Sequence, residues 1–193
     1  MESKIFEGLK GSVAAQTDFA QQNVQTIVNL VECIVDAFNG GNKLLVFGNG
    51  GSAADAQHMA AEFVNRFLID RRPLPAIALT TDSSILTSIG NDFSFDDIFL
   101  KQLQALGKEG DIVLGISTSG NSANVIKAIE YSKASGMTTV ALTGGKGGAL
   151  LGIADVGLNV ETSFTPHIQE THIWVEHMIC QLVDEVMFGG SES

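Results

Sequence analysis

Five short and nearly continuous apolar runs divide the chain, at residues 44–47, 76–79, 112–116, 139–142 and 156–160. Strands that are covered on both faces have such unbroken runs, whereas half-exposed strands alternate apolar and polar residues. Segments with helical spacing lie between the runs, and strands that alternate with helices indicate right-handed crossovers and a parallel sheet. We therefore predict an α/β fold, a three-layer αβα sandwich around a five-stranded parallel sheet.

Two of the intervening helices have clear sequence signals at their starts. Ser52 precedes a helical pattern over 53–67, and Ser122 or Asn121 precedes one over 123–135. Serine and asparagine are favoured at the N-cap because their side chains accept hydrogen bonds from the first free N–H groups of a helix.

Long N- and C-terminal helices flank this pattern. The front stripe comprises Val24, Ile27, Val28, Val31, Ile34, Val35 and Phe38. The back stripe comprises Ile168, Ile173, Val175, Met178, Ile179, Leu182, Val183 and Val186. Such stripes either cover the domain's own core or form an oligomer interface. We expect a single domain over 1–193, with the helical segment 1–40 at an oligomer interface and a frayed tail over 189–193.

Charge and composition narrow the location and the partners. The chain has 22 acidic and 11 basic residues, a formal charge of −11, which argues against a general nucleic-acid or anionic-membrane surface. It begins without a signal-peptide pattern and has no apolar run of roughly 18 residues, so we expect a cytoplasmic protein with no membrane span. Cys33 and Cys180 are expected to be buried, reduced thiols.

The residues that follow the third apolar run are rich in hydroxyl groups. They read Ser117-Thr118-Ser119-Gly120-Asn121-Ser122 and lead into a helix, an arrangement that can bind phosphate through hydroxyls and backbone N–H groups. A capped turn with solvated hydroxyls is the alternative. The loop lacks the Gly-Lys-Ser/Thr ending of a nucleotide P-loop, and the stretch 48–54 does not complete G-x-G-x-x-G, so we expect no nucleotide cofactor.

A second candidate is a pair on the helix after Gly51. His58 and Glu62 are four residues apart and therefore share one helix face. Such a pair can bind a metal, divide acid and base roles, or form a plain surface contact. Asp55 could orient the His58 ring, or it could simply face solvent.

The last helix carries a dense polar set on an apolar background: Gln169, Glu170, His172, Glu176 and His177. His177, in the middle of the apolar run, could be a core histidine bonded to a carbonyl. Gln169 and His177 are separated by a rise of roughly 12 Å in a straight helix, too far for one helix to supply both to a single zinc ion. Either Gln169 lies outside the regular helix, or more than one subunit builds the site.

Asn91 and Asp92 form a polar pair that follows the segment 85–90. We predict that they lie in a loop, where they could bind sugar hydroxyls or form an Asx-turn.

Taken together, these segments resemble the sugar isomerase (SIS) family and, within it, the phosphoheptose isomerases. The matching stretches run in order along nearly the whole chain: 48–52, His58 with Glu62, 90–93, 115–124, 141–144 and 168–170 with His172 and His177. The resemblance implies isomerisation of sedoheptulose 7-phosphate to D-glycero-D-manno-heptose 7-phosphate, the first step toward the heptose of the lipopolysaccharide core. It also implies a homotetramer with active sites between subunits, and zinc.

The resemblance assigns a role to each matching position. It makes Glu62 and His177 the acid/base pair and implies zinc ligands at His58, Glu62, Gln169 and His177. The implied phosphate ligands are Ser117, Thr118, Ser119 and Ser122. The other implied substrate contacts are Asn49, Gly50, Gly51, Glu62, Asn91, Asp92 and Gln169.

Some features point elsewhere. His167, with Pro166 ahead of it, stands where relatives commonly carry an arginine before Ile-Gln-Glu. The stretch 73–82 resembles a non-catalytic SIS module that binds the bacterial replication initiator, but that module departs from the pattern at the positions of Glu62 and His177. Because this chain keeps both residues, the sequence favours catalysis. An isomerase for another sugar phosphate would use the same loop.

Overall fold

A computed structural model of the chain describes residues 1–189, and the rest of the predicted tail lies outside the described residues. The elements, in chain order, are α1 (Glu2–Asn39), β1 (Leu44–Gly48), α2 (Gly51–Val64), β2 (Ala76–Ala78), α3 (Ser83–Asp92), the 3₁₀ turn η1 (Phe95–Asp97), α4 (Leu100–Leu106), β3 (Ile112–Ser117), α5 (Ala123–Ala134), β4 (Thr138–Gly144), α6 (Gly148–Ile153), β5 (Val156–Val160) and α7 (Thr165–Phe188). The predicted strands are confirmed to within two residues at either end.

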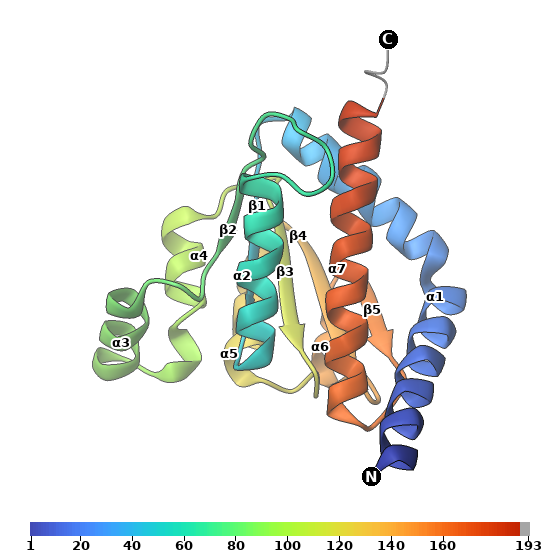
Figure 1. Cartoon of the computed structure of the whole chain (residues 1–193). Helices are drawn as coiled ribbons and strands as arrows, with labels where there is room; N and C mark the ends of the chain where they lie inside the picture. Colours follow the sequence, from blue (N-terminus) through green and yellow to red (C-terminus); the bar gives the residue numbers. More distant parts are fainter. Residues whose placement is uncertain (190–193) are drawn as a thin grey trace.

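The sheet is parallel throughout, in the order β2-β1-β3-β4-β5. Figure 1 shows α1, α2 and α7 on one face, with α5 and α6 behind the sheet. Two apolar clusters fill the layers. Leu44, Val46 and Leu114 point toward α1, α2 and α7, while Leu45 and Val113 point toward α4, α5 and α6. The predicted αβα sandwich is therefore confirmed.

The strand order places a switch point between β1 and β3. Connections leave these neighbouring strands in opposite directions, and ligands of open parallel sheets bind in the crevice beyond the carboxyl ends at such a point. Gly48 pairs with Ile116 in the sheet register. The glycine-rich loop after β1 and the serine-rich loop after β3 therefore emerge side by side.

The start of α2 differs from the prediction. The helix begins at Gly51 with Gly50 as its N-cap, and Ser52 is buried in the first turn without serving as the cap. Gly50 has φ 59° and ψ −119°, a conformation open to glycine, so the glycine-rich loop turns into the helix earlier than a serine cap would. The helix also ends at Val64, before the predicted Phe67.

The two flanking helices pack against each other and cover the core, while leaving apolar residues outside it. Ile27, Leu30 and Ile34 of α1 are buried. The N-terminal half of the same helix, the lower end of α1 in Figure 1, exposes an apolar row at Ile5, Phe6, Leu9 and Val13. Val24, Val28 and Val186 from the predicted stripes are also exposed.

Both thiols are free, but only one is buried. Cys180 lies inside α7, whereas Cys33 is exposed on α1, so the expectation of burial is wrong for Cys33. The buried residues of α1, such as Leu30 and Ile34, face the core and leave Cys33 outside it. None of the helices among residues 1–189 combines the length and apolar character needed to cross a membrane.

Candidate functional site

The serine-rich loop forms the turn between β3 and α5. Ser117 closes the strand, and its hydroxyl lies 2.9 Å from that of Ser122 and 3.5 Å from that of Ser119. Ser122 is the N-cap of α5, although its hydroxyl bonds Ser117 instead of the helix backbone. Only one hydroxyl proton is used within each such pair, so the loop retains protons to donate to an anion.

Gly120 allows this loop to touch the next one. Its φ is +64°, and a Cβ atom there would lie 1.8 Å from the carbonyl oxygen of Gly147. The Gly120 carbonyl accepts from the N–H of Leu150, and the Asn121 side chain accepts from the N–H of Ala149. The loop after β4 and the first turn of α6 therefore pack against the serine-rich loop and hold it by hydrogen bonds.

A cleft of about 370 Å³ opens beside these two loops. It is lined by Thr118, Ser119, Asn121, Gly144, Gly145, Lys146, Gly148, Thr162, Ser163, Thr165 and Ile168. Lys146 is exposed at this cleft and brings a cation close to the hydroxyls. Lys146 was not among the predicted site residues. Its position in the sequence could have indicated it, because it follows β4, and β4 ends at the same sheet edge as β3.

Asn49, a predicted substrate contact, is engaged within the chain. Its side-chain amide exchanges two hydrogen bonds, each 2.9 Å, with the amide of Asn124 on α5. This pairing ties the glycine-rich loop to the helix that follows the serine-rich loop. Asn124, which is buried, was not among the predicted site residues. Asn49 and Gly50 also line a smaller pocket of about 160 Å³ on the α3 side.

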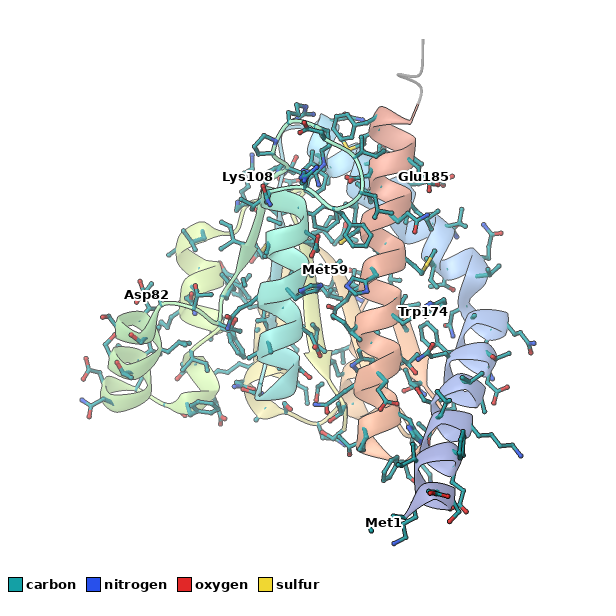
Figure 2. The ribbon with its side chains drawn as sticks, in the orientation of Figure 1. Met1, Met59, Asp82, Lys108, Trp174 and Glu185 are labelled. Carbon is teal, nitrogen blue, oxygen red and sulfur yellow. The ribbon has the colours of Figure 1, made fainter. Side chains whose placement is uncertain are left out.

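The second group of predicted residues meets between α2 and α7. In Figure 2 these are the two helices on either side of the Met59 label. Nε2 of His58 lies 2.8 Å from Nε2 of His177 and 3.4 Å from Oε1 of Glu62. The Phe67 ring stacks on His177, with centroids 5.4 Å apart. The predicted proximity of His58 and Glu62 is confirmed, and the fold adds His177 from 115 residues further along the chain.

The environment of this cluster keeps His177 neutral. Burial lowers the pKa of His177, the neighbouring His58 lowers it further, and Glu62 opposes both. At neutral pH the imidazole can therefore both accept and donate a proton. Because the two Nε2 atoms are within hydrogen-bond distance, one ring donates and the other accepts.

The core histidine of α7 is His172. It is fully buried, its Nε2 lies 3.0 Å from the carbonyl oxygen of Thr143, and burial lowers its pKa to about 4. His177 is partly exposed, so the alternative that it is the core histidine is wrong.

A buried carboxyl group, Glu176, and a half-buried one, Asp55, lie beside the histidine cluster. Burial raises the pKa of Asp55 to about 6, against the opposing charge of His58. Burial and the charge of Asp55 raise the pKa of Glu176 well above its usual range. The Asp55 side chain is half-buried, with its Oδ2 atom turned away from solvent.

Gln169 lies near the N-terminal end of α7, whereas His177 of the cluster lies near the middle of the helix. It is part of the regular helix, two turns before His177, and its amide is so close to Gly51 that a Cβ atom there would lie 2.3 Å from Nε2. The alternative that Gln169 lies outside the helix is therefore wrong. Gln169 lies against the first turn of α2, beside the glycine-rich loop.

Asn91 and Asp92 are the predicted site residues whose positions in the structure differ most from the prediction. They form the last turn of α3 instead of a loop, both are exposed, and the Asn91 amide donates to Asp92 Oδ1 at 2.8 Å. Neither residue lines the cleft or the smaller pocket. Asp82 caps the start of this helix by accepting from the N–H of Ile85, a signal that was present in the sequence and predicts a helix there.

A metal can be tested against the donor atoms. Two imidazole nitrogens and a carboxylate oxygen are the donors of many catalytic zinc sites. Zinc-bound donors in a tetrahedral site are about 3.3 Å apart. The His58–Glu62 separation fits this value, whereas the 2.8 Å between the rings is a hydrogen bond. Among residues 1–189, no group of three or more His, Cys, Asp or Glu side chains is arranged as a metal site.

The chain was compared with known proteins. The SIS domain family model matches residues 9–144. The chain is 50% identical over 188 residues to the phosphoheptose isomerase of Thermodesulfovibrio yellowstonii, covering 97% of this chain and 94% of the relative.

Solved structures of phosphoheptose isomerases also match this chain. Phosphoheptose isomerase GmhA from Neisseria gonorrhoeae superposes with a TM-score of 0.90 at 42% identity, covering 95% of this chain and 98% of that one. A phosphoheptose isomerase from Francisella tularensis superposes with a TM-score of 0.91 at 39% identity, covering 95% and 97%. The chain therefore belongs to the SIS domain family and, within it, to the group of the phosphoheptose isomerases.

Proposed function

We propose that the chain isomerises sedoheptulose 7-phosphate to D-glycero-D-manno-heptose 7-phosphate, a reaction that supplies heptose for the lipopolysaccharide core. The observation that carries the proposal is the Glu62–His58–His177 cluster, an acid/base set in a chain that also has a hydroxyl-lined cleft at the carboxyl edge of its sheet. The family and the names of its similar members support the substrate.

The cleft is the proposed phosphate site. Hydroxyls of Thr118 and Ser119 face it, with Ser117 and Ser122 behind them, and the Lys146 ammonium offsets the charge of a dianion in a chain with a formal charge of −11. Phosphate held here supplies binding energy remote from the reacting carbons and fixes their register.

The proposed chemistry is a proton transfer between adjacent carbons. The Glu62 carboxylate removes a proton from C1 of the ketose, and His177 donates a proton to the oxygen on C2, giving an enediol. Glu62 then returns its proton to C2 while His177 takes the proton of the C1 hydroxyl, and the C1 oxygen becomes the aldehyde. The lowered pKa of His177 suits this role, because the neutral ring can donate its N–H and recover it within one turnover.

Zinc is proposed as the resident metal on the chemistry of the donor set. His58, Glu62 and His177 would hold it, provided that the two rings rotate out of their mutual hydrogen bond. When bound, zinc would supply positive charge that stabilises a developing oxyanion. A carboxylate bound to a metal is a poorer base. Turnover with and without zinc therefore tests whether Glu62 acts as the base or as a metal ligand.

A homotetramer is proposed with sites completed between subunits. The exposed apolar row of α1 supplies a surface to bury, and Gln169, Asn91 and Asp92 lie apart from the histidine cluster within one chain. Chains carrying Glu62→Gln and chains carrying Asp92→Ala, refolded together, should then recover more turnover at low substrate than the mean of the two alone. Activity equal to that mean would refute sharing across subunits.

The test of the function is turnover of the purified chain on three phosphosugars: a heptulose, a pentulose and a hexulose phosphate. We expect aldose formation from sedoheptulose 7-phosphate to exceed the other two, to fall after chelation and to return with zinc. Preference for a shorter ketose would reassign the substrate. No turnover on any of them would support the non-catalytic alternative.

A further inference from the structure

Arg71 lies in the segment between α2 and β2, and its guanidinium is buried against the end of α2. Its side chain is 2% exposed. Nη2 donates to the carbonyl oxygen of Glu62 at 2.9 Å, and Nη1 donates to that of Phe63 at 2.7 Å and to that of Asn65 at 3.1 Å. These carbonyls belong to the last turn and the C-cap of the helix, which have no following helical N–H to bond. Arg71 therefore completes the C-terminus of α2 together with the N–H of Leu74, which donates to the Phe63 carbonyl at 3.0 Å.

The same guanidinium reaches α7. Its Nε donates to Oδ1 of Asp184 at 2.9 Å, and the Asp184 side chain is 1% exposed. Asp184 follows His177 by seven residues, which is two helical turns and nearly the same helix face. Figure 1 shows the chain after α2 looping toward α7 before it returns to β2. Arg71 thus joins the turn that carries Glu62 to the face that carries His177.

We propose that Arg71, paired with Asp184, is a positioning residue for the isomerase site, holding the Glu62 carboxylate in register with His177. The inference rests on the proposed function, in which those two groups move the proton. Glu62 lies in the last turn of α2, where an unsupported helix frays, and a displacement of about 1 Å can cost roughly a hundredfold in rate. A planar fork with five donors is suited to binding several carbonyls and a carboxylate at once.

The rival interpretation is that the pair only stabilises the fold. Buried ion pairs can often be replaced by apolar residues of similar size without loss of stability, whereas removing one partner leaves an uncompensated charge. The double replacement Arg71→Met with Asp184→Leu therefore separates the two interpretations. It restores packing between the helices but removes the Arg71 donor from the Glu62 carbonyl and leaves the Phe63 carbonyl with the Leu74 N–H alone.

The experiment measures kcat, KM and the melting temperature of the full chain with sedoheptulose 7-phosphate. We expect the double variant to melt within a few degrees of the parent, to keep KM within threefold and to lose at least tenfold in kcat. KM is spared because the serine-rich loop receives no bond from Arg71. Arg71→Lys keeps the charge opposite Asp184 but not the fork, and we expect a several-fold loss in kcat at unchanged KM.

Lys43→Met is the matched control. Lys43 pairs with the buried Asp111 before the amino ends of β1 and β3, at the sheet edge opposite the cleft. Its loss should lower the melting temperature while leaving kcat unchanged. If the double variant does not fold, Arg71→Lys carries the test.

The possible failures are distinguishable. Parental kcat in a folded double variant, or in Arg71→Lys, overturns the positioning role and leaves the proposed function intact. Parental kcat in Glu62→Gln overturns the role of Glu62 and with it the reason for holding this residue in register. An inactive parent chain overturns the function itself.

Discussion

Replacing His172 with glutamine should change how the stability of the protein depends on pH. His172 is fully buried in α7, and burial lowers its pKa to about 4, against 6.5 in an unfolded chain. The unfolded state therefore binds a proton below pH 6.5 that the folded state refuses until about pH 4. The stability present above pH 6.5 is lost as the pH falls through this window.

The size of the effect follows from the two pKa values. At pH 5, about 1.5 units below its pKa, the imidazole of the unfolded chain is protonated. The imidazole of the folded chain is still neutral at this pH. At about 1.4 kcal/mol per unit, the parent loses about 2 kcal/mol between pH 7 and pH 5 through this one residue. Glutamine stays neutral throughout, and its amide can donate to the Thr143 carbonyl that His172 contacts.

The assay is urea unfolding of the parent and of His172→Gln at pH 7 and pH 5, followed by fluorescence of the single tryptophan, Trp174. Protein concentration is kept fixed because association would add to the apparent stability. Carboxyl groups such as Asp111 and Asp155, whose pKa values are lowered by their ion pairs, act equally in both proteins. The stability difference should shift by about 2 kcal/mol toward the variant at pH 5. An unchanged difference would refute the reasoning.

Three predictions concern the cleft. Ser119→Ala should raise KM several-fold with little change in kcat, because it removes one hydroxyl donor; an unchanged KM would exclude Ser119 from phosphate binding. Lys146→Met should raise KM by about tenfold and weaken inhibition by inorganic phosphate, whereas equal inhibition constants would argue against its role. Gly120→Ala should lower the melting temperature and abolish phosphate inhibition, because its Cβ would overlap the Gly147 carbonyl; a parental melting temperature would contradict this.

The sequence predicted the sheet well because its signal is local and strong. Apolar runs such as 44–47 and 112–116 have no stable place except between two helical layers, and they lie there. The edge on which the loops meet followed from the parallel topology alone. The helix over 83–92 was missed because the polar pair Asn91-Asp92 is typical of a turn, although Asp82 marks a helix start.

The candidate site was predictable only in part. The sequence indicates that His58 and Glu62 are neighbours, since helical spacing fixes that distance, but His177 joins them through the packing of α7 on α2. Nothing in the sequence around Arg71 indicates a role for it. Its hydrogen bonds go to carbonyls of α2 and to a carboxylate of α7, which only the fold brings together. Asn49 looked like a free substrate contact, and the fold pairs it with Asn124.

The most direct test of the account is kcat on sedoheptulose 7-phosphate for Glu62→Gln and His177→Gln, with the melting temperature and oligomeric state of each compared with those of the parent. Both substitutions keep side-chain size and polarity while removing the ability to exchange a proton. General acid or base catalysis typically contributes about 10²- to 10⁴-fold, so the account predicts a loss in that range for each folded variant. A kcat within threefold of the parent in either variant would contradict it.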